Sequence, residues 1–128
     1  MTTFLNPPEV HKPVGAYSHT AAVPESASLL FLSGQVGMRP DGSVPSAFSE
    51  QVEVTFQNLR ACLAAYGLNL NSVVKLSTFL LPGQDVQIMR EVRQRYLGNH
   101  QPASTTVYVP QLVDPVFLIE IEAIAAIR

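Results

Sequence analysis

The sequence predicts an α+β fold, with a single mixed β-sheet and two helices packed on one of its faces. Two segments repeat their apolar residues with a helical period, and both follow segments rich in the apolar and β-branched residues typical of strands. The expected order is strand, strand, helix, strand, helix, strand, strand, which favours one sheet with both helices on the same side. A chain of 128 residues has nothing left to cover the other face. Association with copies of itself is the simplest cover.

The first helix is expected over residues 49–66. Its apolar residues are spaced by four, three, four and three, so they fall on one helical face. Ser49 is the expected N-cap, and Gly67 is the expected left-handed stop. The expected inward face consists of Val52, Phe56, Leu59, Leu63 and Tyr66.

The second helix is expected to follow Asp85 as its N-cap and to stop at Gly98, with Met89, Val92 and Tyr96 inward. Residues 1–14 read as an extended arm. Strands are expected at 17–23, 29–32, 73–81, 104–109 and 116–127. In the last strand, alternation separates two faces. One face holds Phe117, Ile119, Ile121 and Ala123, and the other holds Leu118, Glu120, Glu122 and Ile124.

The composition bounds the class of protein. Hydrophobic residues make up 47% and charged residues 14%, which suits one packed domain over residues 1–128. The net charge of −2 and the lack of a basic stripe argue against a nucleic-acid partner. Cys62 is the single cysteine, so no intrachain disulfide forms, and the three histidines lack metal-binding spacing. No leader or membrane-spanning run is visible, so a cytoplasmic protein without membrane partners is expected.

Two glutamates, Glu120 and Glu122, interrupt the apolar last strand. They lie on one face, with Cα atoms about 6.6–6.8 Å apart. Burial raises the pKa of a carboxyl group and suits it to general acid-base catalysis. Alternatively, this edge is exposed to solvent, or one glutamate pairs with Lys75 or an arginine. The spacing alone does not choose between the two glutamates.

Three further segments carry candidate groups. In residues 15–19, the Tyr17 hydroxyl could donate to a ligand and His19 could transfer protons, although a surface turn explains them equally. Gly34 follows an apolar strand, where glycine permits close backbone approach or marks a bulge. Residues 104–106 carry three hydroxyls that could bind a carboxylate or a water molecule, or that reflect ordinary strand propensity.

Together, segments spread from about residue 13 to the C-terminus resemble the RidA/YjgF family. They are Gly15-Ala16-Tyr17-Ser18, Phe31-Leu32-Ser33-Gly34-Gln35-Val36-Gly37, Gln57-Asn58-Leu59, Val73-Val74-Lys75, Phe79-Leu80, Pro102-Ala103 and Ile119 to Ala125. The resemblance implies a chorismate-mutase-like fold and a homotrimer with ligand clefts between subunits. It also implies hydrolysis of small enamines or imines to a keto acid and ammonia, without a metal or organic cofactor.

The resemblance also implies roles for individual residues. Tyr17 matches a tyrosine near the ligand, and Gly34 matches a glycine whose backbone lines the cleft. Glu120 matches the glutamate that holds the attacking water, which favours it over Glu122. Thr106 matches a position where a backbone group contacts the ligand.

One position departs from the family pattern. Active deaminases of the family read Pro-Ala-Arg-Ser, whereas this chain reads Pro102-Ala103-Ser104-Thr105. Ser104 therefore replaces an arginine that grips the substrate carboxylate, and serine carries no charge. Arg90 or Arg93 on the second helix falls where the family has other residues. Arg90 could reach a neighbouring subunit's cleft and replace the lost cation, or it could simply be exposed to solvent.

Two functions follow. The first is a hydrolase of a small imine, enamine or related metabolite other than a simple 2-imino acid. In it Glu120 positions water, Tyr17 orients the substrate, and Ser104 and Thr105 recognise it through hydroxyls. The second is a non-catalytic trimer that binds a small metabolite or a partner protein. Ribonuclease activity, once ascribed to some relatives, is disfavoured by the acidic charge balance.

Overall fold

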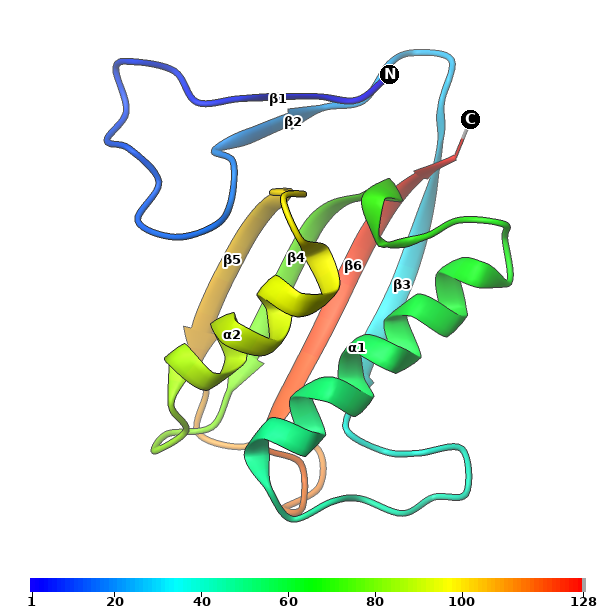
Figure 1. Cartoon of the computed structure of the whole chain (residues 1–128), viewed down its shortest axis with the longest axis vertical. Coiled ribbons are helices and arrows are strands. Elements are labelled where there is room, and N and C mark those ends of the chain that lie inside the picture. The colour runs from blue at the N-terminus through cyan, green and yellow to red at the C-terminus, as the bar shows by residue number, and fades with distance from the viewer. Residues whose placement is uncertain (128) are drawn as a thin grey trace.

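The computed structural model describes residues 1–127 and contains a four-stranded mixed sheet with two helices on one face (Figure 1). β6 runs antiparallel to both of its neighbours, whereas β4 and the edge strand β5 are parallel. This sheet and its helices confirm the predicted α+β layer. In spatial order the strands are β3 (Ser28–Val36), β6 (Ile119–Ile127), β4 (Val73–Leu80) and β5 (Ala103–Tyr108).

The strand predicted over residues 17–23 is present at 20–22, but it belongs to a second, two-stranded sheet with the N-terminal arm, so the prediction of a single sheet is wrong. β1 (Thr3–Leu5) pairs antiparallel with β2 (Thr20–Ala22), across one end of the main sheet (Figure 1). An isolated parallel bridge joins Ser18 to Ala103 at the start of β5. The Ser18 hydroxyl also donates to the Gln101 carbonyl at 2.6 Å. These contacts hold the segment around Tyr17 beside the edge strand.

α1 (Phe48–Ala64) follows the predicted period but differs from the prediction at both ends. Its N-cap is Ala47, which makes no side-chain capping bond, rather than Ser49. The chain leaves the helix at Gly67, which has a φ of 70°, and the Leu68 N–H donates to the Leu63 carbonyl. This turn carries Tyr66 off the inward face, so Tyr66 is 60% exposed and its predicted burial is wrong.

α2 (Val86–Leu97) begins and ends as predicted. The Asp85 side chain accepts a hydrogen bond from the Gln87 N–H, and Gly98 follows the helix with a φ of 57°. Met89 and Val92 are buried, and Tyr96 is half-buried against Phe56 of α1. A single 3₁₀ turn, η1 (Leu70–Ser72), leads into β4.

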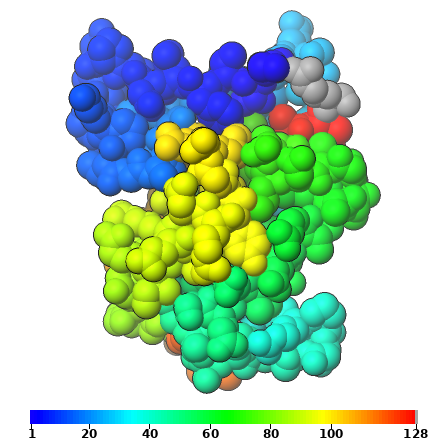
Figure 2. All heavy atoms as spheres, viewed as in Figure 1, coloured from blue at the N-terminus to red at the C-terminus, as the bar shows by residue number. Residues whose placement is uncertain are grey.

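The core lies between the sheet and the helices, and its β6 face matches the predicted alternation. Ile119, Ile121 and Ala123 are buried against the helices, whereas Glu120 is half-buried and Glu122 exposed on the other face. The helices cover the sheet in the space-filling view (Figure 2). The face opposite the helices, called the open face below, exposes 70% of Phe31. No helix of residues 1–127 is long and apolar enough to cross a bilayer.

Candidate functional site

A cavity of about 200 Å³ lies along the edge strand β5, on the side of the sheet that α2 occupies. We call it the edge cavity. Its walls come from three parts of the chain: the loop before β2, helix α2 and strand β5. The lining residues are Val14, Gly15, Tyr17, Arg90, Arg93, Ser104 and Thr106. The structure thus brings together four residues that the sequence selected from separate segments, namely Tyr17, Arg90, Ser104 and Thr106.

The register of β5 decides which hydroxyls enter the edge cavity. Ser104 pairs with Leu76, a core residue that is 1% exposed, so the Ser104 side chain lies on the helix face. Thr105 lies on the open face, where its hydroxyl accepts a hydrogen bond of 2.8 Å from Lys75 Nζ. The strand therefore separates Ser104 from Thr105, and Thr106 is the hydroxyl residue that shares the cavity with Ser104.

The Ser104 hydroxyl is buried and makes no hydrogen bond to any residue that the structure describes. Buried polar groups almost always have a partner, and a buried group without one costs free energy. A small ligand in the edge cavity would supply the missing partner.

Arg93 is the most buried charged side chain of the cavity, at 6% exposure. Across residues 1–127 the ion pairs are Arg39–Glu50 and Arg95–Glu53, and no carboxylate pairs with Arg93. Burial lowers the pKa of Arg93, and the neighbouring positive charge of Arg90 lowers it further. Arg90 is half-buried in the same cavity wall rather than fully exposed.

Sequence reasoning selected Arg90 and left Arg93 as an alternative, although the helical period distinguishes the positions of the two residues. Arg93 follows Met89 by four residues and precedes Leu97 by four, so it lies on the inward face of α2. An arginine at an inward position of an amphipathic helix is the signal that was missed.

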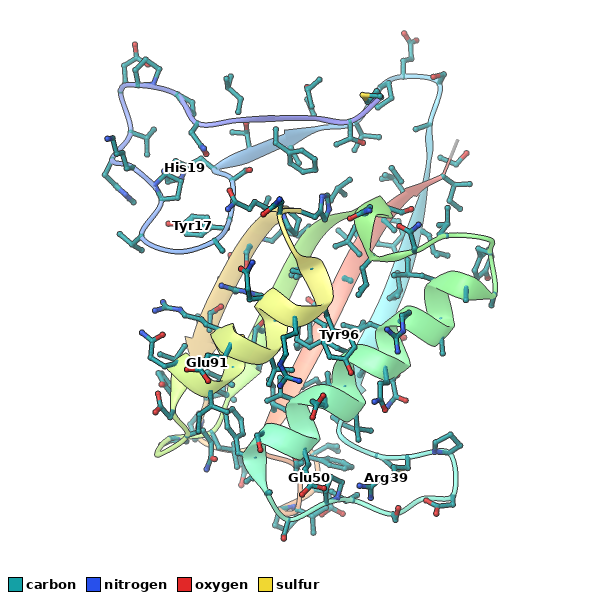
Figure 3. The ribbon with its side chains drawn as sticks, in the orientation of Figure 1. Tyr17, His19, Arg39, Glu50, Glu91 and Tyr96 are labelled. Carbon is teal, nitrogen blue, oxygen red and sulfur yellow. The ribbon has the colours of Figure 1, made fainter. Side chains whose placement is uncertain are left out.

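Tyr17 forms the wall of the edge cavity that faces the N-terminal arm. Its hydroxyl accepts a hydrogen bond from the Val14 N–H at 3.3 Å. Its ring contacts the His19 ring edge-on, with centroids 5.6 Å apart, and Figure 3 shows the two side chains in the same loop. His19 Nε2 donates to the His11 carbonyl at 2.6 Å, and this bond ties the ring to the arm. His19 therefore has a structural role in this state.

Glu120 occupies the open face and lies against the backbone of Gly34. A Cβ atom on residue 34 would overlap Glu120 Oε2 and come within 2.7 Å of the carboxyl carbon. The register of β3 against β6 shifts between Leu32 and Gln35. Gly34 therefore combines both sequence-based alternatives, a bulge and a close approach. Only a residue without a side chain leaves room for the carboxylate there.

Glu122 lies two residues further along the open face, beside a hollow of about 250 Å³ that Lys75 and Ser77 also line. Lys75 donates to Thr105 instead of forming an ion pair with either glutamate. Neither Glu120 nor Glu122 has an ion-pair partner within the described part of the chain. Glu120 differs from Glu122 by its partial burial and its seat over Gly34.

The edge cavity and the Glu120 carboxylate lie on opposite faces of the same sheet. Ser104 and Thr106 face the helices, whereas Glu120 faces away from them. A small ligand held in the cavity of one chain therefore cannot also contact Glu120 of that chain.

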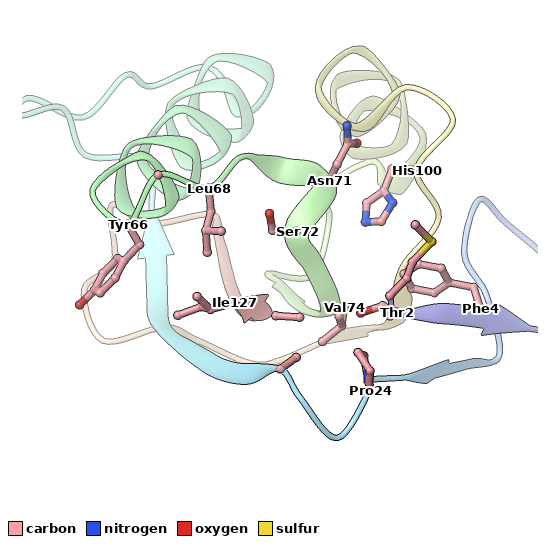
Figure 4. Close-up of a pocket in the computed structure, with 14 residues that line it drawn as sticks. Thr2, Phe4, Pro24, Tyr66, Leu68, Asn71, Ser72, Val74, His100 and Ile127 are labelled. Carbon is pink, nitrogen blue, oxygen red and sulfur yellow. The ribbon is translucent and has the colours of Figure 1, made fainter.

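A larger hollow, of about 490 Å³, lies between the N-terminal strand and the turn after α1 (Figure 4). Its one imidazole, from His100, already donates to the Val73 carbonyl at 2.7 Å, and its ring packs edge-on against Phe4. The described residues hold no group of three or more His, Cys, Asp or Glu placed to bind a metal ion. The edge cavity and Glu120 are therefore the stronger candidates for chemistry.

A mixed sheet, two helices on one face and a strand glutamate seated over a bulge glycine define a class of small α+β proteins. The family model described as Endoribonuclease L-PSP matches residues 8–127. The chain belongs to this family, which is also called RidA/YjgF, as its sequence motifs indicate.

Named relatives and solved structures extend the comparison. A RutC family protein of Pyrococcus horikoshii is 36% identical over 116 residues, 89% of each chain. TdcF of Escherichia coli, named as a reactive intermediate deaminase, is 30% identical over 91% of this chain and 93% of its own. The crystal structure of TdcF with bound serine superposes with a TM-score of 0.73 over 91% of each chain, at 28% identity. A Rid-family protein of Yersinia pestis gives a TM-score of 0.86 over 98% of each chain, at 25% identity.

Proposed function

We propose that this protein hydrolyses the C=N bond of a small imine, or of the enamine that tautomerises to it, without a cofactor. Membership of the RidA/YjgF family supports this reaction class, as does a relative named as a reactive intermediate deaminase. The observation that carries the proposal is the Glu120 carboxylate, which is half-buried over Gly34 and free of any ion pair among residues 1–127.

The proposed chemistry needs one group that takes and returns a proton. Water adds to the imine carbon while Glu120 accepts a proton from it. The same proton then passes to the nitrogen, which gives a carbinolamine. Glu120 next accepts the proton of the new hydroxyl and delivers it to the nitrogen, so the C–N bond breaks and ammonia leaves as the carbonyl forms. One water is consumed for each imine, and the sum of the products is one carbonyl compound and one ammonia.

The site is proposed to be shared between copies of the chain. Because the edge cavity and Glu120 lie on opposite faces, the cavity of one chain must meet Glu120 of another. The open face carries exposed apolar side chains suited to such a contact, including Phe31 at 70%, Leu29 at 47% and Val107 at 40% exposure. A homotrimer with clefts between subunits, as the family resemblance implies, satisfies both requirements.

Substrate recognition is where this chain departs from its family pattern. Ser104 offers a hydroxyl at the position of the family's arginine, so β5 supplies no cation. Tyr17, Gly34 and Thr106 are proposed to line the cleft, with Ser104 donating to the substrate. TdcF was crystallised with serine, a molecule that carries a carboxylate.

A second function follows from that same serine. Without an arginine on β5, the chain could be a non-catalytic trimer that binds a small metabolite or a partner. The two functions differ in one measurable quantity, the turnover of an imine.

The test is ammonia release, or loss of imine absorbance, with 2-imino acids generated in situ by an amino-acid oxidase. The wild type is compared with Ser104→Arg, which restores the family residue. Turnover by the wild type supports the hydrolase. Turnover only by Ser104→Arg would place the natural substrate outside the simple 2-imino acids. Absence of turnover in both variants, across imines of several side chains, would favour the binding protein.

A further inference from the structure

The edge cavity holds a cation and a hydroxyl that have no ion-pair or hydrogen-bond partner within the described part of the chain. Arg93 is 6% exposed as a residue and has no ion-pair partner in residues 1–127, and the Ser104 hydroxyl is buried without a hydrogen bond to any described residue. Both line the same space of about 200 Å³. One is a planar cation with several donors, and the other is a neutral hydroxyl.

We propose that the edge cavity is a carboxylate-binding site, in which Arg93 of α2 supplies the cation that Ser104 of β5 cannot. The Arg93 guanidinium pairs with the carboxylate of a small 2-oxo or 2-imino acid, and the Ser104 hydroxyl donates a further hydrogen bond. The choice of a carboxylate over other small anions rests on the proposed function. The presence of an anion site rests on the cavity alone.

The electrostatics of the free cavity favour an anionic ligand. A buried charge without a partner is costly, and truncating one member of a buried pair is destabilising for the same reason. Arg90 adds a second positive charge three residues away, on the adjoining part of the helix surface. The lowered pKa of Arg93 has the same two causes, burial and the neighbouring Arg90. A bound carboxylate offsets both the cost of burying the Arg93 charge and its repulsion from Arg90.

The geometry explains why the cation comes from the helix. Arg93 shares the inward face of α2 with Met89 and Val92, so its side chain starts from a packed position. Serine is short and leaves the cavity open where a longer side chain would fill it. A guanidinium can bind a carboxylate through two parallel hydrogen bonds, which fixes the orientation of the ligand.

The binding test uses 2-oxobutanoate, a 2-oxo acid of the kind that hydrolysis of a 2-imino acid releases, titrated into the intact protein by calorimetry. Arg93→Gln is expected to weaken binding at least about tenfold, because a hydrogen bond to a charged group is lost. Arg95→Gln is the matched control. It removes a cation from the same helix, but one that pairs with Glu53 outside the cavity, so binding should stay within about twofold. The neutral 2-oxobutanamide should bind wild type and Arg93→Gln alike.

A stability measurement separates a binding role from a structural one. Because Arg93 has no ion-pair partner in residues 1–127, Arg93→Gln should leave the thermal midpoint unchanged or raise it. A lowered midpoint together with unchanged affinity for 2-oxobutanoate would overturn the proposal. Ser104→Ala gives an independent reading, since it removes only a hydroxyl without a partner. It should weaken 2-oxobutanoate binding about fivefold, and unchanged affinity would count against the site.

The catalytic proposal fails separately from this one. Glu120→Gln should still bind 2-oxobutanoate, because Glu120 lies on the face of the sheet away from the edge cavity, and in the proposed assembly a neighbouring copy's Glu120 meets the ligand only at its reacting carbon. If the wild type binds 2-oxobutanoate through Arg93 but turns over no imine, the hydrolase proposal is contradicted and the anion-site proposal is supported. If the wild type turns over an imine but Arg93→Gln leaves the affinity for 2-oxobutanoate unchanged, the anion-site proposal is contradicted and the hydrolase proposal is supported.

Discussion

The two faces of the four-stranded sheet are built from the same strands and have opposite characters. On the helix face, Leu76, Ile119 and Ile121 are at most 1% exposed. On the open face, Phe31 is 70% exposed and Glu120 and Glu122 stand among apolar neighbours. Strand alternation produces this difference, because successive side chains point to opposite sides.

The comparison teaches that each face holds one half of the proposed chemistry. On the helix face, the edge cavity is lined by two arginines and two hydroxyl residues. The open face carries the Glu120 carboxylate. Burial strengthens the attraction between the cations of the edge cavity and a bound anion. The Glu120 carboxylate needs a cover that excludes bulk water. In the proposed homotrimer, a second copy of the chain would provide that cover and would also bring the two halves together.

The largest expected effect on turnover comes from Glu120→Gln, which keeps the shape of the side chain and removes the proposed proton acceptor. Turnover of an imine should fall by about 10²–10⁴-fold, the usual contribution of a general base. Steady-state ammonia release measures it. Glu122→Gln is the matched control on the same strand face, since Glu122 is exposed and does not lie over Gly34. Equal losses in the two variants would contradict the choice of Glu120.

The next effect concerns the cover of the open face. Phe31→Asp places a charge on the exposed apolar surface of the open face, so the proposed homotrimer should dissociate to monomers. Imine turnover should fall at least about tenfold with it, because a shared site needs two copies. Sedimentation velocity and activity are measured on the same sample. Val113→Asp changes a residue that is 91% exposed in a loop and should leave both unchanged. A wild type that sediments as a monomer would remove the shared site altogether.

Gly34 and Gly37, near the end of β3, allow the position of the Glu120 carboxylate to be tested separately from the stability of the fold. Gly34→Ala forces the Glu120 carboxylate to move, so turnover should fall about tenfold while the thermal midpoint changes little. Gly37→Ala instead brings a Cβ atom within 2.7 Å of the Gln51 Cα, and backbone yields less than a side chain does. It should cost about 1–3 kcal/mol of unfolding free energy. Denaturant titration and activity of both variants test the distinction, and reversed outcomes would contradict it.

The sequence predicted the regular parts of this molecule because their signals are local. The apolar period of α1, the Asp85 cap of α2 and the alternation of β6 each depend on neighbours within a few residues. The arm was predicted only as extended, because the pairing of β1 with β2 joins segments more than ten residues apart. The predicted burial of Tyr66 was wrong because α1 ends at Ala64, so Tyr66 lies in the turn that leads to the left-handed Gly67.

The candidate site was predictable residue by residue but not as an arrangement. Glu120, Gly34 and Ser104 were found from motif positions. That Ser104 faces the helices and Thr105 faces away follows from the register of β5 against β4, which no short stretch of sequence encodes. Arg93 was detectable from its inward phase on α2, yet its missing partner appears only when the surrounding elements are in place.

The smallest expected effect compares two buried serines that differ in whether the hydroxyl has a partner. Ser18 donates to the Gln101 carbonyl at 2.6 Å, whereas the Ser104 hydroxyl has no partner among the described residues. Ser18→Ala should therefore lower the unfolding free energy by about 1 kcal/mol, and Ser104→Ala should change it by about zero or raise it slightly. Paired thermal melts without ligand measure both. A loss in Ser104→Ala as large as that in Ser18→Ala would mean that the hydroxyl is already satisfied in the free protein. The edge cavity would then have no need of a ligand at that position, and the carboxylate would depend on Arg93 alone.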